Sequence, residues 1–185
     1  MLVGVLALQG DYDAHSRCLQ ALGVAVRLVR KPEQLDGINA LLIPGGESSV
    51  FLNFLARDNF WAKLRTFVTN KPSFGTCAGA ILLASEVNNP QQQCLGALDI
   101  SIRRNAYGRQ LQSAIHEVKT TLGGVPLELV FIRAPRITRI GPDVEVLASC
   151  NGDPVWVRQG QRMAATFHPE LSADCRVHAE FLRGI

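Results

Sequence analysis

Long apolar runs are missing from this chain of 185 residues, and so is an N-terminal segment with the layout of a secretory signal. A helix needs roughly 18 consecutive apolar residues to span a bilayer, and no segment reaches that length. The apolar start, residues 2–8, is short, has no basic residue before it and leads directly into Gln-Gly-Asp at residues 9–11. Such a start is typical of a buried first strand, so we expect a soluble protein that does not bind membranes.

Blocks of like charge are also missing. The 19 Lys and Arg residues outnumber the 16 Asp and Glu residues only slightly, and they are scattered along the chain. Aromatic residues make up 6% of the chain and do not interleave with the basic ones. Nucleic acid is therefore not expected as a partner.

Paired cysteines are the third absence. The five cysteines are an odd number without a C-x-x-C spacing, which argues against a disulfide framework and against a cysteine-rich zinc site. We expect no bound metal and a reducing, cytoplasmic environment. Small buried or incidental roles are predicted for Cys18, Cys94, Cys150 and Cys175.

Alternating strand and helix signals dominate the first half of the chain. Strands are predicted at residues 2–8, 24–29, 40–43 and 73–76, and helices at residues 11–22, 50–56, 60–68 and 78–86. Asp11 is the candidate N-cap of the first helix, and Gly23 the residue that stops it. Apolar strands separated by helices predict a parallel sheet covered on both faces, with ligands at the carboxyl ends of its strands.

Shorter strand signals follow in the second half and predict antiparallel or mixed strands. They fall at residues 98–102, 114–118, 127–131, 144–148, 155–157 and 163–167, and a closing helix is predicted over residues 171–182. The apolar content of 47% is sufficient for one substantial core, and no serine-rich or proline-rich linker divides the chain. We therefore expect a single domain over residues 1–185.

The segment Gly-Thr-Cys-Ala-Gly at residues 75–79 has the spacing of a nucleophile on a sharp strand-to-helix turn. Small flanking residues let the backbone pass without clashes. The helix that follows favours negative charge at its N-terminus, and its free N–H groups can bind a developing oxyanion. Cys77 is therefore the candidate nucleophile.

A cysteine nucleophile works best with a histidine that takes and returns a proton. His168 follows the predicted strand 163–167 directly, and Glu170 lies two residues later, where it can orient the imidazole. We predict a triad of Cys77, His168 and Glu170. His15 is expected at the surface, and structural or surface roles are expected for the remaining histidines, His116 and His178.

Two further segments carry polar groups that could bind a substrate. Gly-Gly-Glu-Ser-Ser at residues 45–49 follows a strand, and its glycines allow the backbone to approach a ligand. It lacks the Gly-Lys-Ser or Gly-Lys-Thr ending of a phosphate loop. Arginines at residues 103–104 and at residues 133 and 136 could clamp a carboxylate or could be solvated surface groups, and the residues alone leave both open.

Six motifs together resemble one known family, the glutaminase subunits of pyridoxal 5′-phosphate synthase, which are class I (triad) glutamine amidotransferases. They are Gly-Val-Leu-Ala-Leu-Gln-Gly (4–10), Pro-Gly-Gly-Glu-Ser-Ser (44–49), Gly-Thr-Cys-Ala-Gly (75–79), Arg-Asn-Ala-Tyr-Gly-Arg-Gln (104–110), Phe-Ile-Arg-Ala-Pro (131–135) and Phe-His-Pro-Glu (167–170). The resemblance extends from the first residue to the final helix. It implies the class I amidotransferase fold, a three-layer, flavodoxin-like arrangement with a mixed, mostly parallel sheet and helices on both faces.

The resemblance also implies an activity and a set of residues. The activity is hydrolysis of L-glutamine to L-glutamate and ammonia through a thioester on Cys77, with no cofactor in this chain. The implied roles are glutamine binding for Gly46, Glu47, Ser48, Arg104, Ile132 and Arg133, the oxyanion hole for the N–H groups of Gly46 and Ala78, and activation by reorientation of the peptide at Gln9 and Gly10.

The implied partner is a barrel-shaped synthase subunit that receives the ammonia through a protected channel and uses it to make pyridoxal 5′-phosphate. Two rival interpretations remain: another cysteine hydrolase on a similar scaffold, and a regulatory subunit without catalysis. The connector at residues 88–94, with three consecutive glutamines, departs from the family pattern but does not touch the proposed site.

Overall fold

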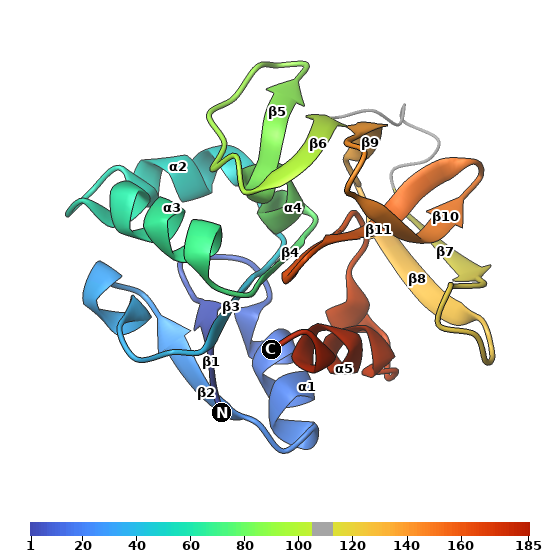
Figure 1. Ribbon diagram of the computed structural model, residues 1–185, viewed down its shortest axis with the longest axis horizontal. Coiled ribbons are helices and arrows are strands. Elements are labelled where there is room, and N and C mark those ends of the chain that lie inside the picture. Colours follow the sequence, from blue (N-terminus) through green and yellow to red (C-terminus); the bar gives the residue numbers. More distant parts are fainter. Residues whose placement is uncertain (105–112) are drawn as a thin grey trace.

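The computed structural model describes residues 1–104 and 113–185 (Figure 1). Its elements follow in chain order: β1 (Leu2–Leu6), α1 (Tyr12–Ala21), β2 (Ala25–Val29), the 3₁₀-helix η1 (Pro32–Leu35), β3 (Ala40–Ile43), α2 (Ser48–Leu55), α3 (Phe60–Asn70), β4 (Ser73–Thr76), α4 (Ala78–Leu83), β5 (Ala84–Asn88), β6 (Leu98–Arg103), β7 (Ser113–Val118), β8 (Leu127–Ile132), β9 (Arg136–Ile140), β10 (Glu145–Cys150), β11 (Asp153–Gln159), β12 (Arg162–Ala165), the 3₁₀-helix η3 (Pro169–Leu171) and α5 (Arg176–Arg183).

The central sheet has seven strands in the order β10-β11-β12-β4-β3-β1-β2. The five strands from β12 to β2 are parallel to one another, whereas β10 and β11 continue the sheet with antiparallel pairing. Counted along the chain, the parallel part has the strand order 2-1-3-4-5 of a flavodoxin-like sheet. The prediction of a mixed, mostly parallel sheet of this type is therefore confirmed.

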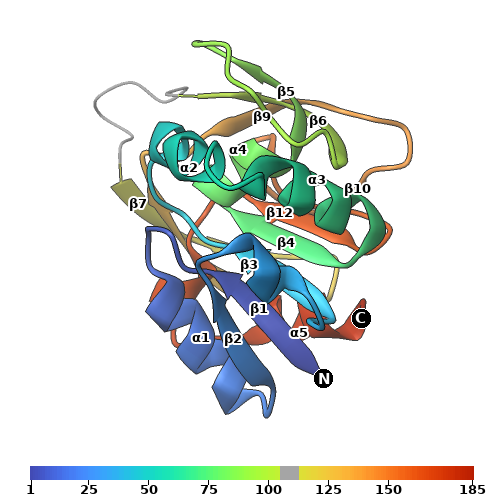
Figure 2. The same cartoon turned by 90° about the vertical axis from the view of Figure 1, so that its left-hand side faces the viewer.

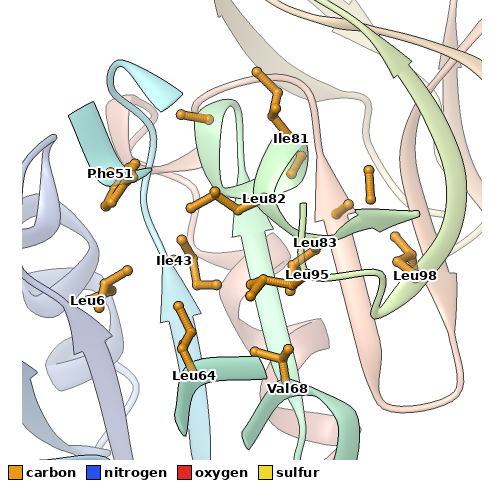
Figure 3. Close-up of a cluster of buried hydrophobic side chains, with 14 of the residues drawn as sticks. Leu6, Ile43, Phe51, Leu64, Val68, Ile81, Leu82, Leu83, Leu95 and Leu98 are labelled. Atoms are coloured by element: carbon orange, nitrogen blue, oxygen red, sulfur yellow. The ribbon is translucent and has the colours of Figure 1, made fainter. Parts of the chain in front are cut away.

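Alternation along the strands gives the sheet two apolar faces, because successive side chains of a strand point to opposite sides. In β3, Leu41 and Ile43 pack with α2, α3 and α4, whereas Leu42 packs with α1 and α5. Figure 2 shows the sheet between these two groups of helices. Helix α3 contributes Leu64 and Val68, whose four-residue spacing puts both on the face toward the sheet (Figure 3). Helices thus cover both faces, as predicted.

The start of α1 also agrees with the sequence. The Asp11 side chain accepts a hydrogen bond of 3.3 Å from the N–H of Ala14, as expected for an N-cap. The helix ends just before Gly23, whose φ of +80° is accessible to glycine at little cost.

Two predicted helices are wrong in their extent. The helix predicted over residues 78–86 ends at Leu83, because residues 84–88 pair with β6 as strand β5 and there bury Ala84 and Val87. The closing helix begins at Arg176 and not at residue 171, because η3 and a turn come first. In that turn the Asp174 carboxylate accepts a hydrogen bond of 2.9 Å from the N–H of Arg176.

Strand β9 was not predicted from the sequence. It pairs with β6 in antiparallel fashion.

The prediction for two cysteines is also wrong. Cys18 on α1 and Cys175 at the start of α5 are joined in a disulfide, with their Cα atoms 6.0 Å apart. They are separated by 157 positions in the chain, and only the packing of α1 and α5 on the same face of the sheet brings them together. Cys77, Cys94 and Cys150 are free thiols.

Within residues 1–104 and 113–185, no helix is both long enough and apolar enough to cross a membrane.

The contact between α4 and β3 gives a first prediction. A Cβ added at Gly79 would lie 2.1 Å from the carbonyl oxygen of Ile43, which is backbone and cannot move aside alone. Alanine is better than glycine in a helix by about 1 kcal/mol, but this overlap forces the helix away from the sheet. We expect Gly79→Ala to lower the free energy of unfolding by roughly 1–3 kcal/mol, measured by urea denaturation. Gly184→Ala is the control, because its Cβ would meet no atom closer than 3.4 Å; equal stability of the two variants would contradict the prediction.

Candidate active site

Cys77 lies on the turn between β4 and α4, in a backbone conformation that few residues adopt. Its φ of 47° and ψ of −103° lie outside the regions favoured by L-residues. The surroundings impose this turn: the Cys77 N–H donates a hydrogen bond of 2.8 Å to the Ala165 carbonyl, and a Cβ at Gly75 would lie 2.4 Å from the Gly79 carbonyl oxygen. This geometry is that of a nucleophile elbow, as the spacing predicted.

The carboxyl end of β12 brings His168 to the same edge of the sheet. Ala165 of β12 pairs in register with Thr76 of β4, the residue before Cys77. The His168 N–H is held by a hydrogen bond of 2.8 Å to the Val130 carbonyl on β8. A Cβ added at Gly45 would lie 2.5 Å from Cε1 of His168 and 3.3 Å from Cβ of Cys77. Glycine at position 45 therefore allows the two side chains to come together.

Glu170 orients the imidazole of His168. Its Oε1 lies 2.7 Å from Nδ1 of His168, and its side chain is fully buried. Burial acts to lower the pKa of His168, but hydrogen bonds and charge interactions with Cys77 and Glu170 raise it from 6.5 to about 10. His168 therefore holds a proton at neutral pH in this state, and it can deliver that proton to a leaving group.

His15 overturns a prediction. It was expected at the surface, yet it is fully buried, and its Nε2 lies 3.2 Å from Oε2 of Glu170. The reason is its helix face: α1 packs against β1 and α5, and His15 shares the inward face with Cys18 and Leu19, three and four residues later. That spacing was a signal in the sequence, but the polar neighbours of His15 concealed it.

A cavity of about 130 Å³ opens beside Cys77. One water needs roughly 10–15 Å³ by this measure, so the cavity has room for a molecule of the size of an amino acid. Its lining contains eight residues predicted from the sequence and two that were not: Gly46, Glu47, Ser48, Cys77, Arg104, Ile132, Arg133 and His168, with Ile81 and Pro135 in addition. Ile81 was missed, although it lies one helical turn after Cys77 on α4.

The charges in this cavity suit a zwitterion. Arg104 and Arg133 supply positive charge, and Glu47 supplies one carboxylate. Glu47 lies 3.0 Å from Arg104, Oε1 to Nη2, and also bonds the Ser49 hydroxyl at 3.1 Å. Ser48 donates a hydrogen bond of 2.8 Å to Gln92 of the connector. The expectation that the connector at residues 88–94 does not touch the proposed site is therefore wrong, because the connector folds back onto the start of α2.

The predicted oxyanion-hole residues stand at the starts of two helices. Ala78 is the first residue of α4, and Gly46 precedes Glu47, the N-cap of α2. The N–H of Ala78 has no partner within its helix, because it belongs to the first turn. Gln9 holds this region through two hydrogen bonds, from its Nε2 to the Glu47 carbonyl at 2.7 Å and to its Oε1 from the Glu47 N–H at 3.1 Å. Gly10 packs so tightly that a Cβ there would lie 1.9 Å from the Gly45 carbonyl oxygen. The oxyanion hole itself stays a prediction.

The motif at residues 104–110 is described only at Arg104, and the rest of it lies outside the described residues. Within residues 1–104 and 113–185, no group of three or more His, Cys, Asp or Glu side chains is arranged to hold a metal ion.

The sheet is flavodoxin-like, and Cys77 lies on a strained turn at its carboxyl edge, beside a polar cavity. These features define a class of α/β proteins that present a thiol to a small polar ligand. Comparison with known proteins narrows this class: residues 5–185 match the SNO glutamine amidotransferase family, and the chain belongs to that family. The resemblance seen in the motifs is thereby confirmed.

Relatives and solved structures support the assignment over nearly the full length. A protein of Koribacter versatilis (strain Ellin345), named pyridoxal 5′-phosphate synthase subunit PdxT, is 61% identical over 183 residues, which cover 99% of this chain and 95% of that protein. A protein of the same name from Thermotoga neapolitana is 46% identical and covers 98% of each chain. A crystal structure of a glutamine amidotransferase matches with a TM-score of 0.91 and 44% identity, covering 98% of this chain and 97% of that one. A putative GMP synthase component from Thermoplasma acidophilum, 20% identical with a TM-score of 0.66 over 100% of this chain and 91% of that one, shares the fold.

Proposed function

We propose that this chain is the glutaminase subunit of a pyridoxal 5′-phosphate synthase, hydrolysing L-glutamine to L-glutamate and ammonia and delivering the ammonia to a synthase subunit. Membership of the amidotransferase family and the names of its relatives support this function. The observation that carries it is the location of Cys77 and His168 in one cavity with two arginines and a carboxylate. All of residues 1–185 act as one glutaminase domain in this proposal.

The reaction follows from the positions of the two side chains. The sulfur of Cys77 attacks the carbon of the substrate's side-chain amide, and a C–S bond forms as the carbonyl oxygen becomes an oxyanion. His168 gives its proton to the amide nitrogen, the C–N bond breaks, and ammonia leaves a γ-glutamyl thioester. His168 then takes a proton from water, the hydroxide attacks the thioester carbon, and the C–S bond breaks to release glutamate. The sulfur leaves with the electron pair of the C–S bond, and His168 keeps the proton taken from water, so both groups are back in the state in which the reaction began.

Three groups assist these steps. Glu170 holds the imidazole with Nε2 free to face the reacting atoms and stabilises the imidazolium. The N–H groups of Gly46 and Ala78 bind the oxyanion: Ala78 opens α4, where N–H groups have no helical partner, and Gly46 lies just before the N-cap of α2.

The remaining residues of the cavity recognise the amino-acid end of glutamine. Arg104 and Arg133 bind the α-carboxylate, since a guanidinium matches a carboxylate with paired hydrogen bonds. Glu47 offers its charge to the α-ammonium group, Ser48 contributes a hydroxyl, and Ile132 contributes its backbone and an apolar wall. The chain needs no metal or cofactor for this chemistry, and pyridoxal 5′-phosphate is the product of the complex.

The partner is a barrel-shaped synthase subunit, and the complex works in the cytoplasm. In this state the Gln9 side chain holds the backbone of Glu47 on both its N–H and its carbonyl. Docking of the partner reorients the peptide at Gln9 and Gly10, so that hydrolysis begins only when the ammonia can be received.

One assay tests substrate, reaction and activation together. Ammonia and glutamate are measured from glutamine with this chain alone and with its cognate synthase subunit, and the release is expected to rise strongly with the partner. An unrelated amide and a short peptide serve as competing substrates. Faster turnover of the unrelated amide or of the peptide than of glutamine would mean that the chain is a different cysteine hydrolase. No turnover of glutamine with the partner present would mean that it is a regulatory subunit. Both results contradict the proposal.

A further inference from the structure

A chain of buried polar side chains continues behind Glu170, away from the substrate cavity. His15 on α1 and His178 on α5 are both 0% exposed. Nδ1 of His15 lies 2.9 Å from Nε2 of His178, and Nδ1 of His178 lies 3.2 Å from Sγ of Cys18. Two helices that carry none of the triad therefore reach the triad carboxylate through side chains in contact.

The second oxygen of Glu170 lacks a well-formed hydrogen bond. Within the described residues Oε2 is buried and has no donor of good geometry, although Nε2 of His15 lies only 3.2 Å away. The same nitrogen also lies 3.2 Å from the Thr76 hydroxyl, so Nε2 of His15 has two oxygen atoms within reach. A buried charged acceptor without a donor is unfavourable, and catalytic hydrogen bonds often tighten only in the substrate complex.

The number of available protons decides how the imidazoles are arranged. Burial, followed by electrostatic interaction with the His178 and His168 rings, lowers the pKa of His15 well below 6.5, and burial lowers the pKa of His178 to about 4. Both rings are therefore neutral near pH 7, and each carries one N–H. Two N–H groups must serve three contacts: Glu170 with His15, His15 with His178, and His178 with the sulfur of Cys18. The contact of His15 Nε2 with the Thr76 hydroxyl does not decide the tautomer, because a hydroxyl can donate or accept.

The sulfur of Cys18 is the weakest of the three acceptors, so it is the one that receives no N–H hydrogen bond. A carboxylate accepts far more strongly than a disulfide sulfur, and hydrogen bonds to charged groups are about twice as strong as neutral ones. His15 then carries its proton on Nε2, toward Glu170, and accepts at Nδ1 from Nε2–H of His178. His178 Nδ1 is left unprotonated beside Cys18, whose disulfide sulfur has no proton to offer.

We infer that His15 is a positioning residue of the active site: its Nε2–H binds Oε2 of Glu170, and His178 fixes the tautomer that makes this possible. The effect on catalysis is geometric. With Oε2 held by His15, the carboxyl group cannot rotate, and Oε1 stays on Nδ1 of His168 at 2.7 Å. This inference rests on the proposed glutaminase function.

Two substitutions at His15 separate positioning from packing. The amide nitrogen of His15→Gln can reach the place of Nε2 and donate to Glu170, whereas the amide of His15→Asn reaches only the place of Nδ1, beside His178. In the complex with the synthase subunit, we expect His15→Asn to lower kcat by roughly 10- to 100-fold, as is usual for groups that orient a functional side chain. KM for glutamine should change less than about twofold, and His15→Gln should recover most of kcat.

The control is His116→Gln, a half-buried histidine on β7 outside the cavity around Cys77, which should keep the wild-type rate. Equal kcat for His15→Asn and wild type would overturn the inference. So would equal losses in His15→Asn and His15→Gln accompanied by equal falls in Tm, because that pattern is one of packing alone. In either case glutamine hydrolysis by the wild-type complex still stands as a separate result, so failure of the inference is distinguishable from failure of the proposed function.

A spectroscopic test needs no turnover. Nitrogen-15 NMR of the histidine side chains in the full-length chain distinguishes the two neutral tautomers by the shifts of the protonated and unprotonated ring nitrogens. The expected result is the Nε2–H tautomer for both His15 and His178. An Nδ1–H tautomer at His15 would overturn the inference, since Nε2 could then only accept.

Discussion

Replacing Cys77 by alanine should abolish glutamine hydrolysis, with kcat in the synthase complex falling by roughly 10⁴-fold or more. The reaction requires a C–S bond, and alanine offers no nucleophile at that place. The fold should be little affected, because alanine differs from cysteine only by the missing sulfur and the turn is held by backbone contacts, among them the 2.8 Å hydrogen bond from the Cys77 N–H to the Ala165 carbonyl. Ammonia and glutamate release measure the first effect, and circular dichroism with partner binding measures the second.

The other free thiols are the matched controls. Cys94→Ala and Cys150→Ala change cysteines that are only partly buried and do not line the cavity around Cys77, and both should keep the wild-type rate. Residual activity of Cys77→Ala near the wild-type level would refute the mechanism.

The same variant has a second, independent readout. Burial acts to lower the pKa of His168, and Cys77 and Glu170 together raise it to about 10. Removing Cys77 leaves burial opposed by Glu170 alone. The pKa of His168 in Cys77→Ala should therefore fall below about 10, as measured by an NMR titration of the imidazole, and an unchanged pKa would mean that Cys77 and His168 do not interact.

The parallel part of the fold was predictable because its signals are local. Apolar strands followed by helices specify a covered parallel sheet, and once the sheet is parallel, the ends of β3, β4 and β12 must share one edge. Cys77 and His168 follow two of these strands, so their proximity is a consequence of the strand order. The motif residues around the cavity followed from the family resemblance more than from local chemistry.

The features that the sequence analysis missed depend on contacts between segments that are far apart in the chain. His15 was expected at the surface because its neighbours in sequence are polar. Its spacing to Cys18 and Leu19 was a weak signal of burial, and the packing of α1 against α5 makes that burial plain. The pair of Cys18 and Cys175 depends on the same packing across 157 positions. The boundary between α4 and β5 is set by β6, a partner strand that begins ten residues after β5 ends, and no local pattern marks it.

Replacing His168 by asparagine should be nearly as damaging as removing the nucleophile. Asparagine cannot carry a proton between the sulfur, the leaving amine and water, and all three transfers use this one imidazole in the proposed mechanism. General acid–base catalysis contributes about 10²–10⁴-fold, and we expect a loss at or beyond the upper end of that range, because the thiol also loses its proton acceptor. The measurement is kcat and kcat/KM for glutamine in the synthase complex.

Glu170→Gln should be milder than His168→Asn, with kcat reduced by roughly 10²-fold. Glutamine keeps the size of the side chain, and its carbonyl oxygen can still accept from Nδ1 of His168, where the carboxylate lies 2.7 Å away. It loses the negative charge that helps to hold the proton on His168, so the pKa of His168 should fall in this variant. The control for His168→Asn is His116→Asn, which removes another histidine and should leave kcat unchanged. The ranking would be wrong if Glu170→Gln lost as much activity as Cys77→Ala while its fold was intact, because Glu170 would then do more than orient the imidazole.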